Sequence, residues 1–174
     1  MRQAGRKAAG DRPWAGCRVA VVTVSDSCAC GSKQDGSGPV LKGLLEALGA
    51  DIVSCEIVAD DAPKIDGLLK GYADASKADV VFTTGGTGLG PRDVTPEATR
   101  SVLDKEAPGL SEWIRARGAA KTARAVLSRG VCGLRGRTLI INLPGSPKGA
   151  AESFEAVAGL LPHALAMARG EGHV

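Results

Sequence analysis

The chain of 174 residues has few aromatic side chains and few histidines. Aromatic residues make up 3% of it, which is too little for the stacking platforms on which proteins hold single-stranded nucleic acids. Its two histidines, His163 and His173, lie beside a predicted helix break and in the C-terminal tail. We therefore expect neither a histidine-activated nucleophile nor a zinc site built on histidines.

Long apolar runs are also missing. No run approaches the roughly 20 residues of a membrane-spanning helix, and the N-terminal arginines are not followed by the apolar segment of a secretory signal. The five cysteines include no Cys-x-x-Cys pair, which favours a reducing compartment. Cys28 and Cys30 could form half of a metal site, but the sequence offers no partners, so reduced thiols in a loop are the favoured interpretation. We expect a cytoplasmic protein that binds no membrane.

The net charge of +3 is concentrated at the N-terminus. Residues 1–16 contain four basic side chains and one acidic side chain, so residues 17–174 carry no net charge. A neutral body offers no electrostatic footprint for nucleic acid. The length predicts one domain. We predict that residues 1–16 are a disordered basic tail and that residues 17–170 form this domain.

Short apolar segments alternate with amphipathic ones along the chain. Four of the apolar segments predict buried strands: Arg18–Val24, Asp51–Val58, Ala78–Phe82 and Arg137–Leu143. Helices are predicted at six places: one capped by Ser37, Ala62–Ser76, one capped by Thr95, one starting at Pro108, Ala119–Ser128, and one capped by Ser146 that breaks at Pro162. This alternation indicates an α/β fold, a three-layer α/β/α sandwich with a mostly parallel central sheet.

The most informative stretch is Thr83–Thr99, TTGGTGLGPRDVTPEAT, which follows the third predicted strand. Its turn, Gly85-Gly86-Thr87-Gly88, can adopt positive φ and direct amide N–H groups toward an anion. Arg92 and Asp93 then place a cation and a metal-capable carboxylate beside a helix N-terminus. The segment lacks the Gly-Lys-Ser/Thr of a P-loop, and Pro91 stands where a Rossmann fingerprint needs its third glycine. A glycine-rich turn with a solvated arginine and aspartate is the alternative interpretation.

Polar residues also follow the other predicted strands: Thr23, Ser25 and Asp26; Asp60 and Asp61; and Pro144, Gly145 and Ser146. Parallel strands present such residues at one edge of the sheet, where α/β proteins bind ligands. Asp60 and Asp93, if the fold brings them together, could hold Mg²⁺ against a polyphosphate. Asp61 is expected to cap the following helix instead, and a role at this helix start is the alternative for Asp60.

Together these motifs resemble those of the MogA/MoaB family of molybdenum cofactor biosynthesis proteins, which includes the G domain of gephyrin. The resemblance rests on Thr83–Thr99, on Leu127-Ser128-Arg129 and on Asn142-Leu143-Pro144-Gly145-Ser146-Pro147, and it covers about Arg18 to Ala168. It implies a single α/β/α domain that forms a homotrimer. It also implies adenylylation of molybdopterin by Mg²⁺-ATP, with release of pyrophosphate.

The resemblance further implies roles for single residues. The family's two essential aspartates fall on Asp60 and Asp93, which would hold Mg²⁺, and a hydroxyl near the pterin falls on Ser128. Phosphate-binding positions are implied at Gly85, Gly86, Thr87, Gly88, Gly145 and Ser146. The family's strand-end serine and aspartate fall on Ser25 and Asp26. We expect further substrate contacts at Thr23, Arg92, Asn142 and Pro144, with pairing to a neighbouring side chain as the alternative for Arg92. The chain departs from the family at Ala59, where members often have proline, but it keeps the carboxylate that follows.

Two other functions stay open on the sequence. Some proteins of this family carry the fold without demonstrated transfer activity, so the chain could be a non-catalytic molybdopterin carrier or scaffold of the MoaB type. The presence of both aspartates favours the enzyme. A dinucleotide-dependent oxidoreductase on a similar sheet would need the glycine fingerprint that this chain lacks. Pyrophosphate release and NAD(P) binding are the measurements that separate the three.

Overall fold

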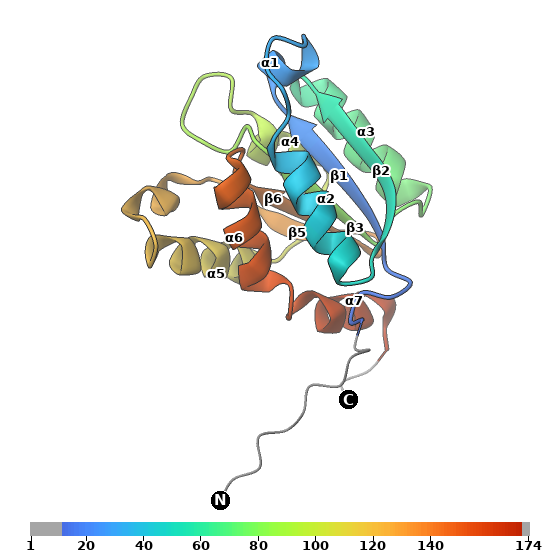
Figure 1. The fold of residues 1–174 in the computed structure, drawn as a ribbon. Helices are drawn as coiled ribbons and strands as arrows, with labels where there is room; N and C mark the ends of the chain where they lie inside the picture. Colours follow the sequence, from blue (N-terminus) through green and yellow to red (C-terminus); the bar gives the residue numbers. More distant parts are fainter. Residues whose placement is uncertain (1–11, 172–174) are drawn as a thin grey trace, which may run out of the picture.

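The computed structural model describes residues 12–171, so the disorder predicted for residues 1–11 lies outside the described residues. The strands are β1 (Arg18–Val24), β2 (Asp51–Val58), β3 (Val80–Thr84), β4 (Lys105–Glu106), β5 (Cys132–Arg135) and β6 (Thr138–Leu143). The helices are α1 (Asp26–Ala29), α2 (Ser37–Ala47), α3 (Ala62–Asp74), α4 (Thr95–Val102), α5 (Pro108–Ala119), the 3-10 helix η1 (Ala123–Leu127), α6 (Pro147–Val157) and α7 (Leu161–Arg169). Figure 1 shows how the helices surround a single twisted sheet.

The sheet has the strand order β2-β1-β3-β6-β5-β4. The pairs among β2, β1, β3 and β6 are parallel, whereas β5 and β4 are added antiparallel at one edge. The prediction of an α/β fold with a mostly parallel sheet is therefore confirmed. The antiparallel edge was not predicted, because β4 has only two residues, both charged, and Gly133 and Arg135 interrupt the apolar pattern of β5.

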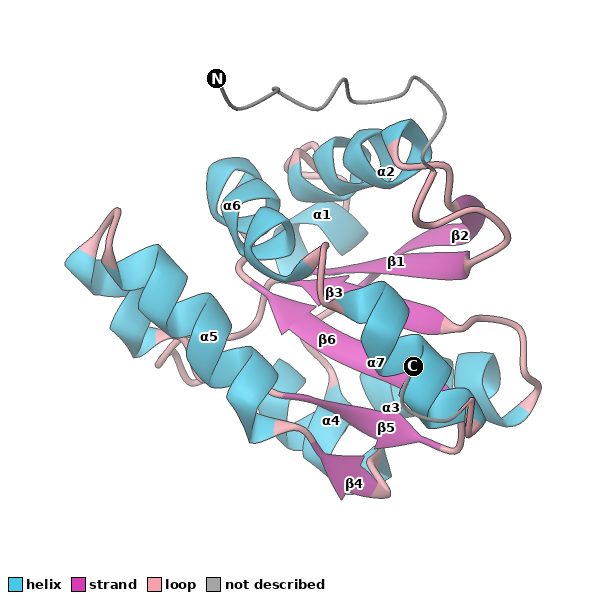
Figure 2. Ribbon diagram, turned by 90° about the horizontal axis from the view of Figure 1, so that it is seen from below, coloured by secondary structure: helices cyan, strands magenta, loops and turns pink. Residues whose placement is uncertain are grey.

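Helices cover both faces of the sheet, as Figure 2 shows, which makes the three layers. On one face, α2, α5, α6 and α7 bury side chains such as Leu45 and Phe154 against Val19 and Val21 of β1. On the other face, α3 and α4 bury theirs against the alternate residues of the same strand, such as Val22. Because every strand of the parallel part is buried on both faces, its residues read as continuous apolar runs.

One predicted helix is wrong. Ala119–Ser128 was expected to be helical, but α5 ends at Ala119 and only the 3-10 helix η1 follows. The chain turns back at this point, and Thr122 adopts an extended conformation. Ala125 then packs against Gly118 so closely that a Cβ on the glycine would lie 2.8 Å from the alanine Cβ. This tertiary contact replaces the continuous helix.

Two of the predicted helix caps are also wrong. Asp61 and Ser146 do cap α3 and α6, through the amides of Lys64 and Gly149. Ser37 and Thr95, however, are the first residues of their helices rather than their caps. Asp35 takes over the capping role at α2, since its Oδ1 accepts the amides of Ser37 and Gly38 at 2.9 and 3.1 Å.

The folded domain begins earlier than predicted. Trp14 falls in the expected basic tail, yet it is only 1% exposed. Its ring centroid lies 6.3 Å from that of Phe82 and 5.7 Å from that of Phe154. The boundary expected at residue 16 is therefore wrong for residues 12–16, because a large apolar ring in this segment fills part of the core.

No helix among residues 12–171 combines the length and the apolar character that crossing a membrane requires. The five cysteines are free thiols. In the same range, no group of three or more histidine, cysteine or acidic side chains is arranged to hold a metal ion. Cys28 and Cys30 therefore have no third ligand in the described structure.

Candidate active site at the carboxyl ends of the strands

A cavity of about 490 Å³ opens at the carboxyl ends of the parallel strands, and we call it the Asp60–Asp93 cavity because both carboxylates line it. Six more of the predicted site residues line it: Thr23, Ser25, Gly85, Gly86, Gly145 and Ser146. The cavity lies where β1 connects to one side of the sheet and β3 to the other. Open α/β sheets bind ligands at such a switch point. The sequence left open whether the fold brings Asp60 and Asp93 together, and in the structure both line this one cavity.

Close backbone approach at the strand ends explains two of the glycines. Gly85 has a φ of +100°, and a Cβ there would clash with the carbonyl oxygen of Val24. A Cβ on Gly145 would lie 3.0 Å from the Cα of Gly85. The ends of β1, β3 and β6 can therefore come together only with glycine at these positions. The amide of Gly85 donates to the carbonyl of Leu143 at 3.1 Å, so it is engaged within the protein.

Asp60 is held in the cavity by the turn that follows β1. Its Oδ2 accepts the backbone amide of Asp26 at 2.8 Å. Partial burial raises the pKa of the Asp60 carboxyl, and the nearby charges of Asp26 and Asp93 raise it further. A cation between Asp60 and Asp93 would relieve this repulsion.

Asp93 sits inside a tight turn. Its Oδ2 accepts the amide of Gly90 at 2.7 Å. A Cβ on Gly88 or Gly90 would lie 2.9 or 2.7 Å from this same oxygen. The two glycines thus leave room for the carboxylate, which is the physical reason for their place in the motif.

Arg92 and Asp26 do not line the Asp60–Asp93 cavity. The Nε and Nη2 atoms of Arg92 donate to the two carboxylate oxygens of Asp26, each at 3.0 Å. This contact lowers the pKa of the Asp26 carboxyl and raises the pKa of the arginine. The structure therefore pairs the two residues with each other, and it connects them to the cavity through Asp60.

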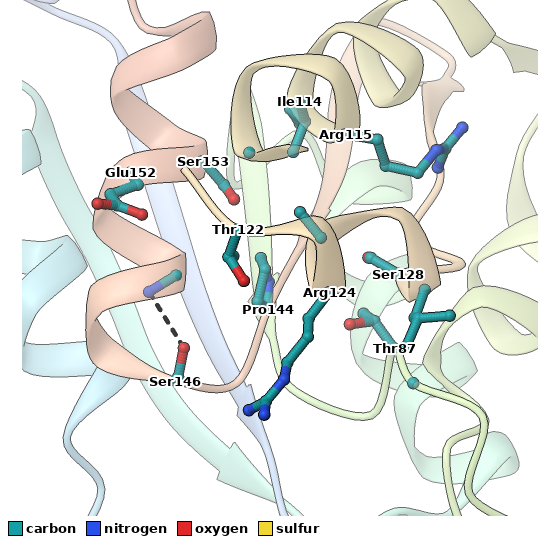
Figure 3. Close-up of a pocket in the computed structure, with 15 residues that line it drawn as sticks. Thr87, Ile114, Arg115, Thr122, Arg124, Ser128, Pro144, Ser146, Glu152 and Ser153 are labelled. Carbon is teal, nitrogen blue, oxygen red and sulfur yellow. Dashed lines mark hydrogen bonds between the residues drawn. The ribbon is translucent and has the colours of Figure 1, made fainter. Parts of the chain in front are cut away.

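A second cavity of about 280 Å³ lies beside the first, between α5, η1 and α6 (Figure 3), and we call it the Ser128 cavity. Of the predicted site residues, those that line it are Thr87, Gly88, Ser128, Pro144 and Ser146. Ser146 lines both cavities. Two pockets that meet at one serine can hold two reactants side by side.

Three arginines near the Ser128 cavity were not predicted as site residues. Arg115 and Arg124 line it, as Figure 3 shows, and Arg129 contacts the turn that holds Asp93. The first two lie on elements predicted as ordinary amphipathic helices, where an arginine is usually solvated. Of the three, only Arg129 could have been singled out from the sequence, because it belongs to the Leu127-Ser128-Arg129 motif.

Asn142 was predicted to contact substrate, but it lines neither cavity. It is buried, and its Nδ2 donates to the hydroxyls of Thr83 and Thr99, each at 2.9 Å. Its Oδ1 accepts the amide of Val131 at 3.2 Å. These bonds tie β6 to β3 and α4, so Asn142 satisfies buried polar groups below the site.

The oxygen atoms of the Asp60–Asp93 cavity fit a hard divalent cation such as Mg²⁺, which prefers carboxylates and phosphate oxygens. Asp60 Oδ1 lies 2.9 Å from the position that a Cβ of Gly86 would take. The hydroxyl of Thr95 lies still closer to that position; it is buried and has no hydrogen-bond partner within residues 12–171. The donor set that lines the cavity therefore consists of the carboxylates of Asp60 and Asp93, whereas Thr95 lies buried behind Gly86 and does not line it.

Comparison with known proteins gives consistent results. Residues 20–163 match the family model described as "Probable molybdopterin binding domain". The chain is 38% identical over 154 residues to the molybdopterin adenylyltransferase of Helicobacter pylori, covering 87% of this chain and 88% of that one. It is 47% identical over 146 residues to the molybdenum cofactor synthesis protein cinnamon of Drosophila melanogaster, covering 83% of this chain but only 24% of that longer protein.

The solved structures include one of the molybdopterin biosynthesis enzyme MoaB from Thermus thermophilus. It aligns with a TM-score of 0.84 at 51% identity, over 88% of this chain and 97% of that one. A MogA structure aligns with a TM-score of 0.82 at 44% identity, over 87% and 99% of the two chains. The chain therefore belongs to the molybdopterin-binding domain family of molybdenum cofactor biosynthesis proteins, as its motifs indicate.

Proposed function

We propose that this protein transfers an adenylyl group from ATP to molybdopterin in the presence of Mg²⁺. The observation that carries the proposal is the junction of the two cavities, in which Asp60 and Asp93 line one side and Ser128 lines the other. Relatives of similar length are named molybdopterin adenylyltransferase. The five free cysteines fit a reducing cytoplasm.

In this proposal the triphosphate of ATP occupies the Asp60–Asp93 cavity and the pterin occupies the Ser128 cavity. A terminal phosphate oxygen of molybdopterin attacks the α-phosphorus of ATP. A bond forms between them, the bond from the α-phosphorus to the bridging oxygen breaks, and pyrophosphate leaves. The attacking oxygen is already anionic, so the reaction needs no strong general base.

The residues of the chain then act by positioning and charge compensation. Asp60 and Asp93 would hold Mg²⁺, which supplies positive charge to the triphosphate. The helix start at Ser146, with Pro147 in its first turn, directs its positive end toward phosphate oxygens at the junction. Arg124 and Arg115 offer further positive charge on the pterin side.

Asp93→Asn tests the proposal. Incubation with molybdopterin, Mg²⁺ and ATP should give adenylyl-molybdopterin and pyrophosphate with the parent protein, and no product above background with the variant. Molybdopterin binding, followed by fluorescence quenching, should be unchanged. Asp74→Asn is the matched control, because Asp74 pairs with Arg135 and lines neither cavity. Normal transfer by Asp93→Asn would contradict the metal role, and a parent that binds molybdopterin without transfer would support a carrier.

We also propose that the protein assembles as a homotrimer. Large apolar side chains are exposed on α5 and η1, namely Trp113, Val126 and Leu127, of which Leu127 lines the Ser128 cavity. Exposed large apolar side chains on neighbouring elements favour a subunit contact. Light scattering coupled to size-exclusion chromatography gives the mass of the assembly, and a monomer at micromolar concentration would contradict this part of the proposal.

A further inference from the structure

We propose that Arg129 is a positioning residue for the Asp93 carboxylate and that it connects this carboxylate to the Ser128 cavity. The inference rests on the proposed function, because it assigns to Asp93 the binding of a divalent cation. It concerns a side chain that lines neither cavity.

The guanidinium of Arg129 holds both ends of the turn that carries Asp93. Its Nε donates to the carbonyl of Gly88 and its Nη2 donates to the carbonyl of Asp93, each at 2.6 Å. Its Nη1 forms an ion pair with Glu97 in the first turn of α4. The backbone amide of Arg129 donates to the carbonyl of Thr87 at 2.9 Å. Arg129, which lies between η1 and β5, therefore binds this turn by three contacts and the following helix α4 by one.

The middle of this turn is also anchored by Arg92, which binds both carboxylate oxygens of Asp26, whereas its two other large side chains make no such contact within residues 12–171. Leu89 is 69% exposed, and Pro91 is also exposed. At the base, the amide of Thr95 donates to the carbonyl of Gly86 at 3.1 Å. Because the amide of Gly90 holds the Asp93 carboxylate from within, the position of the carboxylate follows the position of the turn. Arg129 thus determines the position of the Asp93 carboxylate without contacting it.

The same arginine connects the two cavities. Thr87 and Gly88, whose carbonyls it binds, line the Ser128 cavity, and so does its neighbour Ser128. A planar guanidinium can bind two carbonyls and a carboxylate at once, whereas an ammonium is a single point with a different reach. Lysine at this position should therefore not restore the arrangement.

The test measures metal binding separately from turnover. Mn²⁺ replaces Mg²⁺ as the probe, and its binding to the protein with a non-hydrolysable ATP analogue is followed by electron paramagnetic resonance. Partners that orient a metal ligand typically contribute 10- to 100-fold to metal affinity, so Arg129→Gln should weaken Mn²⁺ binding by about 10-fold or more. Arg129→Lys should bind Mn²⁺ nearly as weakly as Arg129→Gln does. Molybdopterin affinity and the melting temperature are measured in parallel.

Arg135→Gln is the matched control. Like Arg129, Arg135 binds a carboxylate and a backbone carbonyl: two of its nitrogens donate to Asp74 and the third donates to the carbonyl of Val102. It lines neither cavity. Its loss should lower stability without changing Mn²⁺ affinity. Unchanged Mn²⁺ affinity in Arg129→Gln would overturn the inference, and so would an equal loss of affinity in Arg135→Gln.

Two further outcomes are distinguishable. If the parent protein binds no Mn²⁺ with the nucleotide analogue, the proposed function itself fails. If circular dichroism shows that Arg129→Gln does not fold, Arg129→Lys decides, because an ammonium keeps the positive charge but cannot bind two carbonyls and a carboxylate at once. Reduced Mn²⁺ affinity in folded Arg129→Lys supports the inference, and parental affinity overturns it.

Discussion

Asp26, at the start of α1, and Asp60, in the loop after β2, exchange two hydrogen bonds, each from the backbone amide of one residue to the carboxylate of the other. The amide of Asp26 donates to Asp60 Oδ2 at 2.8 Å, and the amide of Asp60 donates to Asp26 Oδ1 at 3.0 Å. Arg92 in turn binds both oxygens of Asp26. The orientation of the cavity carboxylate therefore depends on two side chains outside the cavity.

Replacing Asp26 should weaken the binding of Mg²⁺-ATP without abolishing the adenylylation reaction. Asp26→Ala removes the acceptor of the Asp60 amide and the partner of Arg92, and we expect a rise of about 10-fold in the KM for Mg²⁺-ATP. Steady-state adenylylation at varied Mg²⁺-ATP measures it. Asp61→Ala is the control, since it removes the cap of α3 and should cost about 1 kcal/mol of stability while the KM stays at its parental value.

The raised pKa of Asp60 predicts how stability depends on pH. Burial raises this pKa in the folded protein, so the carboxyl favours folding below its ordinary pKa. That contribution is lost as the pH rises through the raised pKa. Asp60→Asn should therefore melt at a higher temperature than the parent at neutral pH without metal. The difference should vanish in acid, and Mg²⁺ with nucleotide should raise the melting temperature of the parent only. A parent that is the more stable at neutral pH without metal would contradict this reading.

Gly86 should not tolerate alanine. It has a φ of +60°, and a Cβ there would clash with the hydroxyl of Thr95 and lie 2.9 Å from Asp60 Oδ1. Gly86→Ala should cost about 1–3 kcal/mol of stability and displace the Asp60 carboxylate, with loss of adenylylation. Gly67→Ala is the control, because Gly67 lies in α3 with nothing within 4 Å of a Cβ. It should stabilise the protein by about 0.5–1 kcal/mol. Equal thermal stability of the two variants would contradict the steric argument.

The main features of the site follow from local sequence patterns. Apolar β-branched runs predict the four parallel strands, and parallel strands bring their carboxyl ends to one edge of the sheet. That rule places Asp60 and Asp93 in the same cavity although 33 positions separate them in the chain. It also brings Gly85 and Gly145 into contact.

What could not be predicted depends on contacts between distant segments. A serine or threonine before a proline reads as a helix cap, and the pattern holds for Ser146 but not for Thr95, which is the first residue of its helix. Nothing near Arg129 in the sequence shows that its side chain reaches the turn of Asp93. Asn142 likewise lies in a site motif, yet its bonds go to buried threonines.

Trp14 gives a prediction about the N-terminal boundary of the domain. Trp14→Ala empties a place between Phe82 and Phe154, and we expect it to cost about 3–5 kcal/mol of stability in urea unfolding followed by circular dichroism. Trp14→Phe should cost clearly less. It keeps a ring in the core, and the indole Nε1 that it removes is buried without a hydrogen-bond partner in residues 12–171.

Trp113→Ala is the matched control for this measurement, because its ring is 45% exposed and its Nε1 donates to the carbonyl of Ala156 at 2.9 Å. Less burial means a smaller loss of stability than at Trp14. Deletion of residues 1–16 should destabilise the protein about as much as Trp14→Ala, because both remove the same ring from the core. If Trp14→Ala unfolds at the same urea concentration as the parent, residues 12–16 contribute nothing to the core and the domain begins at β1.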